Sequence, residues 1–297
     1  MERFPLGPYE VSRVGFGAMQ LPGPGVKGPP RDREQALAVL RRAVEAGANH
    51  IDTAQYYGPD VSNELIHEAL HPYADDLALV SKVGARRDQQ GGWIPWDAPD
   101  ELRQGIEDNL RSLQTDQLAA VNLRLMDGSV PDQKFDDQLS AMIQAEKDGL
   151  IAGIGLSTIT EAHLEHALQR TDVLCVQNPY NLLERDSQAV LDLCADYGIA
   201  FVPYFPLGSA FRAENPVLNH PEVLAAAERL GRTPAQTVLA WTLSVAPNVL
   251  LIPGTSSLAH LEENLAVADI ELDRRPRRPW TTWSEPPAQA WEPQARR

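Results

Sequence analysis

The sequence is poor in cysteine and has no long apolar run. Its two cysteines, Cys175 and Cys194, are spaced for neither a disulfide framework nor a metal site, so we expect reduced core residues of a cytoplasmic protein. No apolar run is long enough to span a bilayer, and the first residues lack the charged-then-apolar plan of a signal peptide. These absences predict a soluble protein without a membrane segment.

Positive charge is also scarce. The chain has 26 Lys and Arg against 41 Asp and Glu, a net charge of −15. This balance disfavours nucleic acid or an anionic membrane as the main partner, and leaves a small molecule as the expected one. No pair of histidines has a convincing metal-ligand spacing, and we expect His50 and most others on surfaces or helix faces. The oligomeric state is not indicated by the sequence.

Short apolar runs alternate with amphipathic segments along most of the chain. Eight strands are predicted to start near Val14, His50, Leu77, Leu118, Ile151, Val173, Ile199 and Val249, with helices between them. This rhythm predicts a (β/α)8 TIM barrel over residues 1–273, preceded by a β-hairpin that turns at Gly7-Pro8. An open doubly wound sheet is the main alternative, but Gly15-Phe16-Gly17 does not continue into a phosphate-binding fingerprint.

The last residues differ from the rest of the chain. Residues 274–297 are rich in arginine, proline and tryptophan, and show neither a helical nor a strand period. This composition predicts a basic tail that is disordered or loosely docked.

Asp52 and Tyr57 follow an apolar run and are the first candidate functional residues. Buried parallel strands deliver side chains to a site at their carboxyl ends. A carboxylate there requires a cation, and Lys82 stands at the end of the next apolar run. An ammonium held by Asp52 would favour the phenolate of Tyr57 and lower the pKa of Tyr57. We therefore expect Tyr57 to donate a proton to a carbonyl oxygen.

Other strand ends carry residues suited to a nicotinamide ring. Ser157 and Gln177 together can donate to and accept from a carboxamide, and Tyr204 offers a face for stacking. The remaining polar residues at strand ends are Asn122, Arg124, Thr158, Asn178 and Thr255.

The chain resembles an aldo/keto reductase from Phe4 to about Asp273. The segments that carry the resemblance are, in order, Val14-Gly-Phe-Gly-Ala-Met, Ile51-Asp-Thr-Ala-Gln-Tyr-Tyr-Gly, Val80-Ser-Lys-Val, Gly155-Leu-Ser, Val176-Gln-Asn-Pro-Tyr-Asn-Leu-Leu, Pro203-Tyr-Phe-Pro-Leu-Gly, Ile252-Pro-Gly-Thr and Glu262-Glu-Asn. The resemblance implies reduction of an aldehyde or ketone with NADPH, with NADH as the alternative cofactor. Tyr57 would be the general acid, Lys82 would tune it, and Asp52 would hold the lysine.

By the same resemblance, Ser157 and Gln177 would hold the carboxamide, with the Thr158 hydroxyl in reach of it, and Tyr204 would stack on the nicotinamide. The phosphates and the adenine end would lie along Leu207, Ser209, Thr255, Ser256, His260, Glu263 and Asn264.

The chain departs from the family pattern in two important respects, the catalytic histidine and the residues that bind the 2′-phosphate. Arg124 stands where the family usually has a catalytic histidine, and an arginine can orient the carbonyl or pair with an anionic group but cannot donate a proton near neutral pH. The surrounding Val121-Asn-Leu-Arg-Leu-Met resembles a bacterial branch that includes pyridoxal reductases. Gly254 and His260 replace the lysine and arginine that often bind the 2′-phosphate, which predicts a weaker preference for NADPH over NADH.

Three other interpretations remain open from the sequence. Asp52 and Lys82 would form a purely structural ion pair in many barrels. Lys82 would be the nucleophile in a Schiff-base aldolase. A regulatory or interaction protein that binds a nicotinamide cofactor with little turnover would explain the missing histidine. No metal ligand set is predicted.

Overall fold

The computed structural model describes residues 2–126, 130–208, 215–270 and 272. Ser209 and the tail over residues 274–297 lie outside them, so the predictions for these residues stay open. The described part contains no helix that is both long and apolar enough to cross a membrane.

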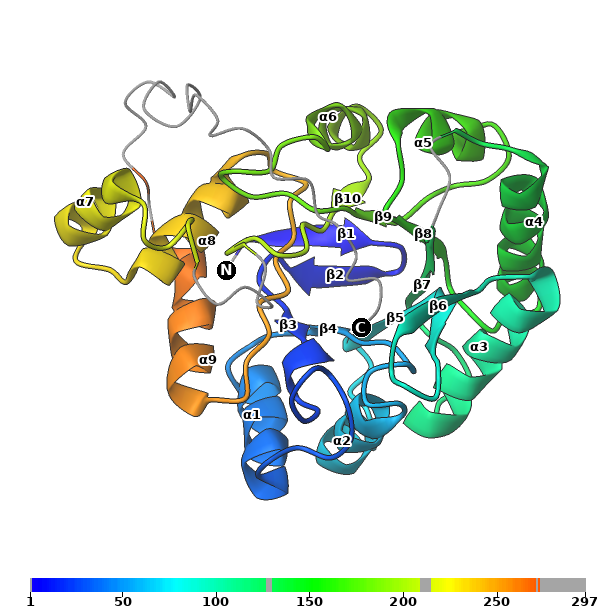
Figure 1. The fold of residues 1–297 in the computed structure, drawn as a ribbon, viewed down its shortest axis with the longest axis horizontal. Helices are drawn as coiled ribbons and strands as arrows, with labels where there is room; N and C mark the ends of the chain where they lie inside the picture. The colour runs from blue at the N-terminus through cyan, green and yellow to red at the C-terminus, as the bar shows by residue number, and fades with distance from the viewer. Residues whose placement is uncertain (1, 127–129, 209–214, 271, 273–297) are drawn as a thin grey trace.

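A closed barrel of parallel strands forms the centre of the molecule (Figure 1). Neighbouring strands follow the order β10, β9, β8, β7, β5, β4, β3. Parallel bridges from Val249 to Phe201 and from Leu251 to Val14 join the two edges, so the residues of the predicted eighth strand close the barrel. The predicted (β/α)8 architecture is confirmed. The strands are β3 (Phe16–Gly17), β4 (His50–Asp52), β5 (Ala78–Arg87), β7 (Ala120–Arg124), β8 (Ile154–Ser157), β9 (Cys175–Gln177) and β10 (Ala200–Phe201).

Helices surround the barrel, and their starts follow local sequence signals. Asp32 caps α1 by accepting a hydrogen bond from the backbone N–H of Gln35 at 3.0 Å, and Thr233 caps α8 in a capping box with Gln236. The helices are α1 (Arg33–Glu45), α2 (Val61–Leu70), α3 (Pro99–Leu113), α4 (Gln133–Lys147), α5 (Glu161–Leu168), α6 (Gln188–Asp196), α7 (Pro221–Leu230), α8 (Pro234–Ser244) and α9 (Leu258–Leu265).

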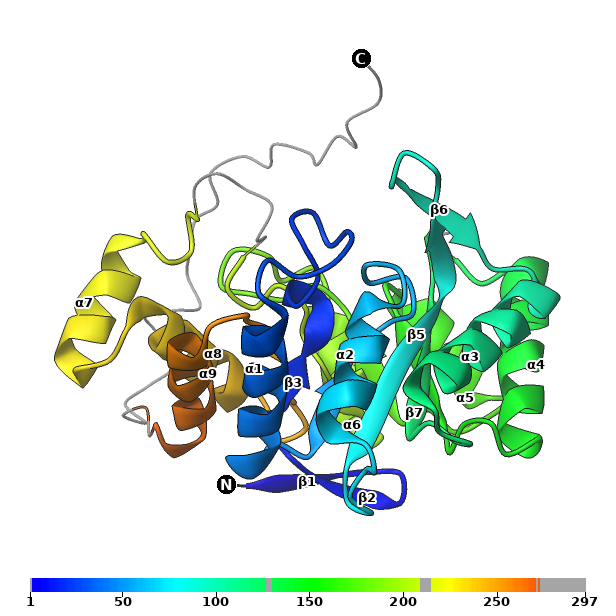
Figure 2. The same ribbon diagram turned by 90° about the horizontal axis from the view of Figure 1, so that it is seen from below.

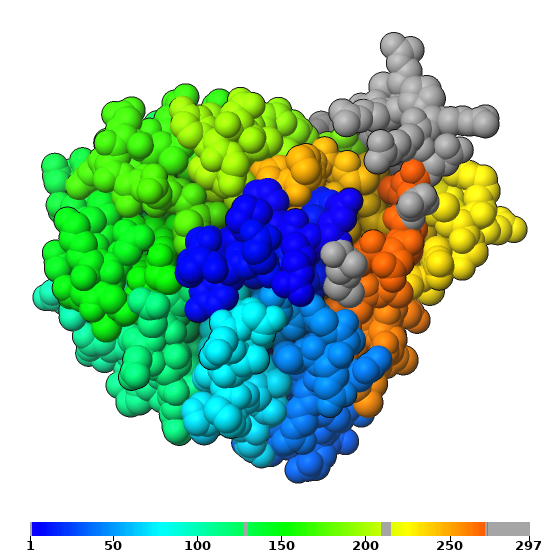
Figure 3. Space-filling view, turned by 180° about the vertical axis from the view of Figure 1, so that it is seen from behind, coloured from blue at the N-terminus to red at the C-terminus, as the bar shows by residue number. Residues whose placement is uncertain are grey.

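The predicted hairpin closes one end of the barrel. It consists of β1 (Arg3–Leu6) and β2 (Tyr9–Ser12), paired with Leu6 opposite Tyr9. Leu6 and Val11 pack against inward-facing strand residues such as Val80 and Ala120. Figure 3 shows this hairpin lying across the centre of that face. The opposite end, where the parallel strands finish, is therefore the end left for a site.

Some details differ from the sequence prediction. The strand that carries Lys82 continues to Arg87 and folds back as β6 (Trp93–Trp96), making a hairpin that rises from the carboxyl end of the barrel (Figure 2). Helix α9 was not predicted. The expectation that His50 is a surface residue was wrong: its side chain is 1% exposed within β4.

Candidate active site

Asp52 and Lys82 form a buried ion pair at the carboxyl end of the barrel. Strands β4 and β5 are adjacent, with Asp52 opposite Val80, and this register carries Lys82 past the end of β4. The Lys82 ammonium donates to Asp52 Oδ1 and to the carbonyl oxygen of Thr53, the latter at 3.0 Å. The side chains are 4% and 8% exposed. Because both charges have hydrogen-bond partners, the pair meets the main condition for burying charge.

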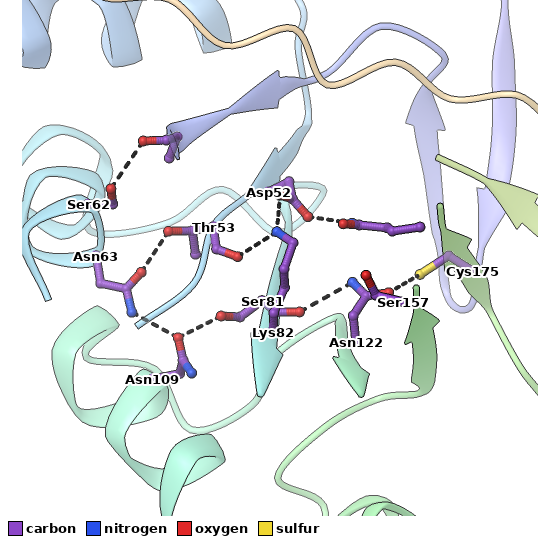
Figure 4. A network of polar contacts seen from close by, with 12 residues as sticks. Asp52, Thr53, Ser62, Asn63, Ser81, Lys82, Asn109, Asn122, Ser157 and Cys175 are labelled. Atoms are coloured by element: carbon purple, nitrogen blue, oxygen red, sulfur yellow. Dashed lines mark hydrogen bonds and ion pairs between the residues drawn. The ribbon is translucent and has the colours of Figure 1, made fainter. Parts of the chain in front are cut away.

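A second layer of polar side chains fixes the backbone beside this pair (Figure 4). Thr53 Oγ1 donates to Asn63 Oδ1 of α2 at 2.8 Å, and Asn63 donates to Asn109 Oδ1 of α3 at 2.9 Å. Ser81 Oγ donates to the same Asn109 oxygen at 2.6 Å. These buried bonds anchor the residues after Asp52 and before Lys82 to two outer helices. The ion pair is therefore held on a rigid frame.

Tyr57 lies against Lys82, as the sequence predicted, but its pKa moves in the opposite direction from the one expected. The Lys82 nitrogen is 5.2 Å from the centre of the Tyr57 ring. Burial raises the pKa of Tyr57, and the charge of Asp52 raises it further, while Arg124 and Arg87 lower it. The Lys82 ammonium donates to Asp52 and to the Thr53 carbonyl rather than to the phenol oxygen. Tyr57 consequently stays protonated at neutral pH.

Arg124 is the last residue of β7 and lies close to Tyr56 and Tyr57. Its Cζ atom lies 5.4 Å from the centre of the Trp93 ring, and Trp93 packs edge-on against Tyr56 at 5.1 Å between centres. Arg124 is partly buried, and no ion pair joins it to a carboxylate among the described residues. Gly84 permits this approach, because a Cβ atom there would lie 2.3 Å from the Arg124 carbonyl oxygen. The guanidinium interacts with the Tyr56 hydroxyl and keeps further donors for a ligand beside Tyr57.

The residues expected to grip nicotinamide come together next to Asp52. Ser157 lies opposite Gln177 in neighbouring strands. The Thr158 hydroxyl is 3.5 Å from that of Ser157 and 3.3 Å from that of Tyr204. Gln177 donates through Nε2 to Asp52 Oδ2 at 2.6 Å, which turns its amide oxygen away from the carboxylate.

That amide oxygen is buried without a hydrogen-bond partner in the part of the chain described. The side chain of Gln177 is 0% exposed, and an unpaired buried acceptor is costly unless a ligand supplies a donor. The NH₂ group of a carboxamide is such a donor. Asn178 instead holds local structure, since it donates to the Ile159 carbonyl at 2.7 Å and accepts from the Ile159 N–H at 3.0 Å.

The remaining candidate cofactor residues lie on one side of the barrel mouth. Thr255 Oγ1 accepts from the Ser257 N–H at 3.1 Å, and Gln35 of α1 donates to the Ser256 carbonyl. The others are half-buried Leu207 after β10, exposed His260, half-buried Glu263 and buried Asn264, the last three on α9. A hollow of about 360 Å³ lies beside Ser256, bounded by residues 19–26, 30–32 and 35. No cluster suited to a metal ion occurs in the described residues.

Sequence reasoning missed Arg87 and left open whether Trp93 lines a pocket mouth or simply caps the barrel. The Cζ atom of Arg87 lies 3.3 Å from the centre of the Trp93 ring. Strict alternation along a strand puts Lys82 and Arg87 on opposite faces, because they are five positions apart. Gly84, with a φ of +102°, interrupts the alternation between them. Gly84 was the one signal in the sequence that the strand could change the face on which its side chains lie.

These features agree with the comparisons to known proteins. A model of the aldo/keto reductase family matches residues 13–276, so the chain belongs to that family and is an oxidoreductase. It is 47% identical over 272 residues to pyridoxine 4-dehydrogenase of Escherichia coli K12, covering 91% of this chain and 93% of that one. It is 39% identical over 267 residues to an uncharacterized oxidoreductase of Schizosaccharomyces pombe, covering 90% and 85%.

A solved structure has the same fold. The aldo/keto reductase of Klebsiella pneumoniae, in complex with NADP and acetate, superposes with a TM-score of 0.76 at 28% identity. The match covers 92% of each chain.

Proposed function

We propose that this protein reduces an aldehyde or ketone to an alcohol with NADPH, and that Tyr57 donates the proton. The observation that carries the proposal is the Asp52–Lys82 pair buried against Tyr57. A structural ion pair alone would not need a phenol on one side and an unpaired amide oxygen on the other. The family match supports the reaction class.

The residues present fit a nicotinamide dinucleotide. We assign the carboxamide to Ser157, Thr158 and Gln177, because Gln177 Oε1 lacks a donor, and the ring to the face of Tyr204. The bound cofactor supplies the hydride. Thr255, Ser256, His260, Glu263 and Asn264 would line the adenosine end, where neutral or partly charged donors stand in place of the family's usual cations and would weaken the preference for NADPH over NADH. The NADP complex of the Klebsiella relative supports this assignment.

Tyr57 transfers its proton to the carbonyl oxygen as that oxygen gains negative charge. Its raised pKa keeps the proton in place until then. The phenolate left behind is stabilised by Arg124 and Arg87, and Lys82 lies over its ring. Asp52 holds the Lys82 ammonium in place by a hydrogen bond. The same arrangement opposes the aldolase interpretation, because a charged lysine with two acceptors is a poor nucleophile.

Arg124 takes the position of the usual histidine with a different role. A guanidinium stays charged, so it stabilises the developing oxyanion without exchanging a proton. It also suits an aldehyde that carries an ionised ring hydroxyl. Together with the similarity to pyridoxine 4-dehydrogenase, this favours a pyridoxal-like aldehyde as substrate. A cytoplasmic location remains part of the proposal.

A substrate screen tests this function. We expect the purified protein to consume NADPH with pyridoxal and with simple aromatic aldehydes, and to form the alcohol in equal amount. A protein that binds NADPH tightly but consumes none with any aldehyde would be a cofactor-binding regulator instead. Trapping of substrate on Lys82 by borohydride would identify an aldolase.

A further inference from the structure

Arg87 connects two segments that rise at the carboxyl end of the barrel (Figure 2). Its Nη1 donates to the carbonyl oxygen of Gly91 in the β5–β6 turn at 2.9 Å. Its Nη2 donates to the carbonyl oxygens of Gly25 and Val26, in the loop after β3, at 3.2 and 3.3 Å. The Arg87 guanidinium also lies over the Trp93 ring, with its Cζ atom 3.3 Å from the ring centre. One side chain thus fixes the hairpin, the loop and the tryptophan together.

The same loop is joined to the segment that carries Tyr57. Gly28 donates its N–H to the Gly58 carbonyl at 2.9 Å, and Val26 packs in one buried cluster with Tyr57. Lys27 adds a second link to the hairpin by donating to the Gln90 carbonyl at 3.0 Å. A displacement of Arg87 would therefore shift Tyr57 as well, because hydrogen-bonded backbone and packed side chains connect the two residues.

Arg87 and Arg124 also concentrate positive charge. Both guanidinium carbons lie near the Trp93 ring, so they are no more than about 9 Å apart, close to the Debye length in physiological salt. Burial, and then the charge of Arg124, lower the pKa of Arg87, and among the described residues the carboxylate that raises it is Asp88, with the smallest effect of the groups that act on it. Neither arginine has an ion-pair partner among the described residues. An acidic protein that holds two arginines together in this way is suited to an anion.

We propose that Arg87 is a positioning residue that biases this reductase toward carbonyl substrates bearing a negatively charged oxygen. Arg124 makes the direct contact, while Arg87 adds the second charge and holds Trp93 against the site. The inference rests on the proposed reductase function. Because both Nη atoms of Arg87 already donate to backbone carbonyls, Arg87 influences the substrate through its electric field and through the position of Trp93.

A matched pair of substrates tests the proposal. The carboxylate 4-carboxybenzaldehyde and its neutral isostere 4-formylbenzamide are compared for wild type, Arg87→Met, Arg87→Lys and the control Arg86→Met. Arg86 is the control because it is the adjacent residue, is exposed, and stacks on Trp96 at 5.7 Å. We expect Arg87→Met to raise KM about fivefold for the carboxylate, the scale of one partly screened charge, and less than twofold for the amide. Arg87→Lys should keep most of the wild-type preference for the carboxylate over the amide, and Arg86→Met should keep all of it.

Salt dependence of wild type gives a second measure that does not rely on a variant folding. Raising ionic strength from about 0.01 M to 1 M shortens the Debye length from about 30 Å to about 3 Å, and should reduce the preference for the carboxylate. Equal losses for both substrates in Arg87→Met, or a wild-type preference absent at low salt, would overturn the proposal. Failure of the reductase function would look different: wild type would consume NADPH with neither aldehyde.

Discussion

Asp52→Asn should separate the structural from the catalytic contribution of the buried ion pair. The substitution keeps the shape of the side chain and one acceptor oxygen but removes the charge that faces Lys82. The side chains of Asp52 and Lys82 are 4% and 8% exposed, so the small stabilisation energies typical of surface ion pairs do not apply. Loss of one partner of a buried pair lowers the free energy of unfolding by about 3 to 5 kcal/mol. We expect a value near 3 kcal/mol, because asparagine keeps one acceptor oxygen for Lys82. For a domain of this size we expect Tm to fall by roughly 6 to 10 °C.

The companion variant Asp52→Asn/Lys82→Met sharpens this test. It removes both charges, so no ammonium is left unpaired in the barrel, and most of the lost Tm should return. Turnover of pyridoxal should stay well below wild type in both variants, because the single variant leaves Lys82 without the carboxylate that holds it against the Tyr57 ring and the double variant removes the ammonium. Thermal melts followed by circular dichroism and assays of NADPH consumption give the two readouts. A double variant no more stable than the single one, or one with near wild-type turnover, would refute the reasoning.

Three further outcomes follow from the structure. Arg124→Gln should lower kcat/KM about tenfold more for aldehydes with an ionised hydroxyl or carboxylate than for neutral ones; equal losses in a substrate panel would argue against pairing with an anion. Gln177→Met should weaken NADPH binding about tenfold in a fluorescence titration by removing the carboxamide acceptor, and unchanged affinity would contradict that role. Burial lowers the pKa of His50 to about 4, so stability present above about pH 6.5 should be lost as pH falls toward 4, by up to about 3 kcal/mol. Urea melts across this pH range should show a smaller loss for His50→Leu, and an equal loss would exclude His50 as its source.

The alternation of strands and helices was predictable because it depends on local hydrophobic period and on caps. In the structure, Asp32, Thr233 and the prolines that begin α7 and α8 stand at helix starts, positions that these residue types favour. The meeting of Asp52, Lys82 and Gln177 was also predictable, since parallel strands bring their carboxyl ends to one face.

The electrostatics of the site could not be read from the sequence in the same way. The direction of the Tyr57 pKa shift depends on burial and then on the charge of Asp52, and the burial of a side chain is not a local property of the sequence. Arg87 was missed because Gly84 changes the face that the strand presents. The hairpin formed by β6 was missed because Pro95 and the preceding glycines favour a loop, and an edge strand tolerates such a proline.

A comparison of Tyr57→Phe with Tyr56→Phe tests the central claim most directly. Both substitutions remove one buried hydroxyl from adjacent residues whose rings pack edge-on at 5.4 Å, so they disturb packing to a similar extent. In single-turnover experiments with saturating NADPH and pyridoxal, we predict that Tyr57→Phe slows NADPH oxidation by about 100-fold or more while binding NADPH normally, and that Tyr56→Phe stays within about threefold of wild type. Equal rates for Tyr57→Phe and wild type would contradict the assignment of Tyr57 as the proton donor.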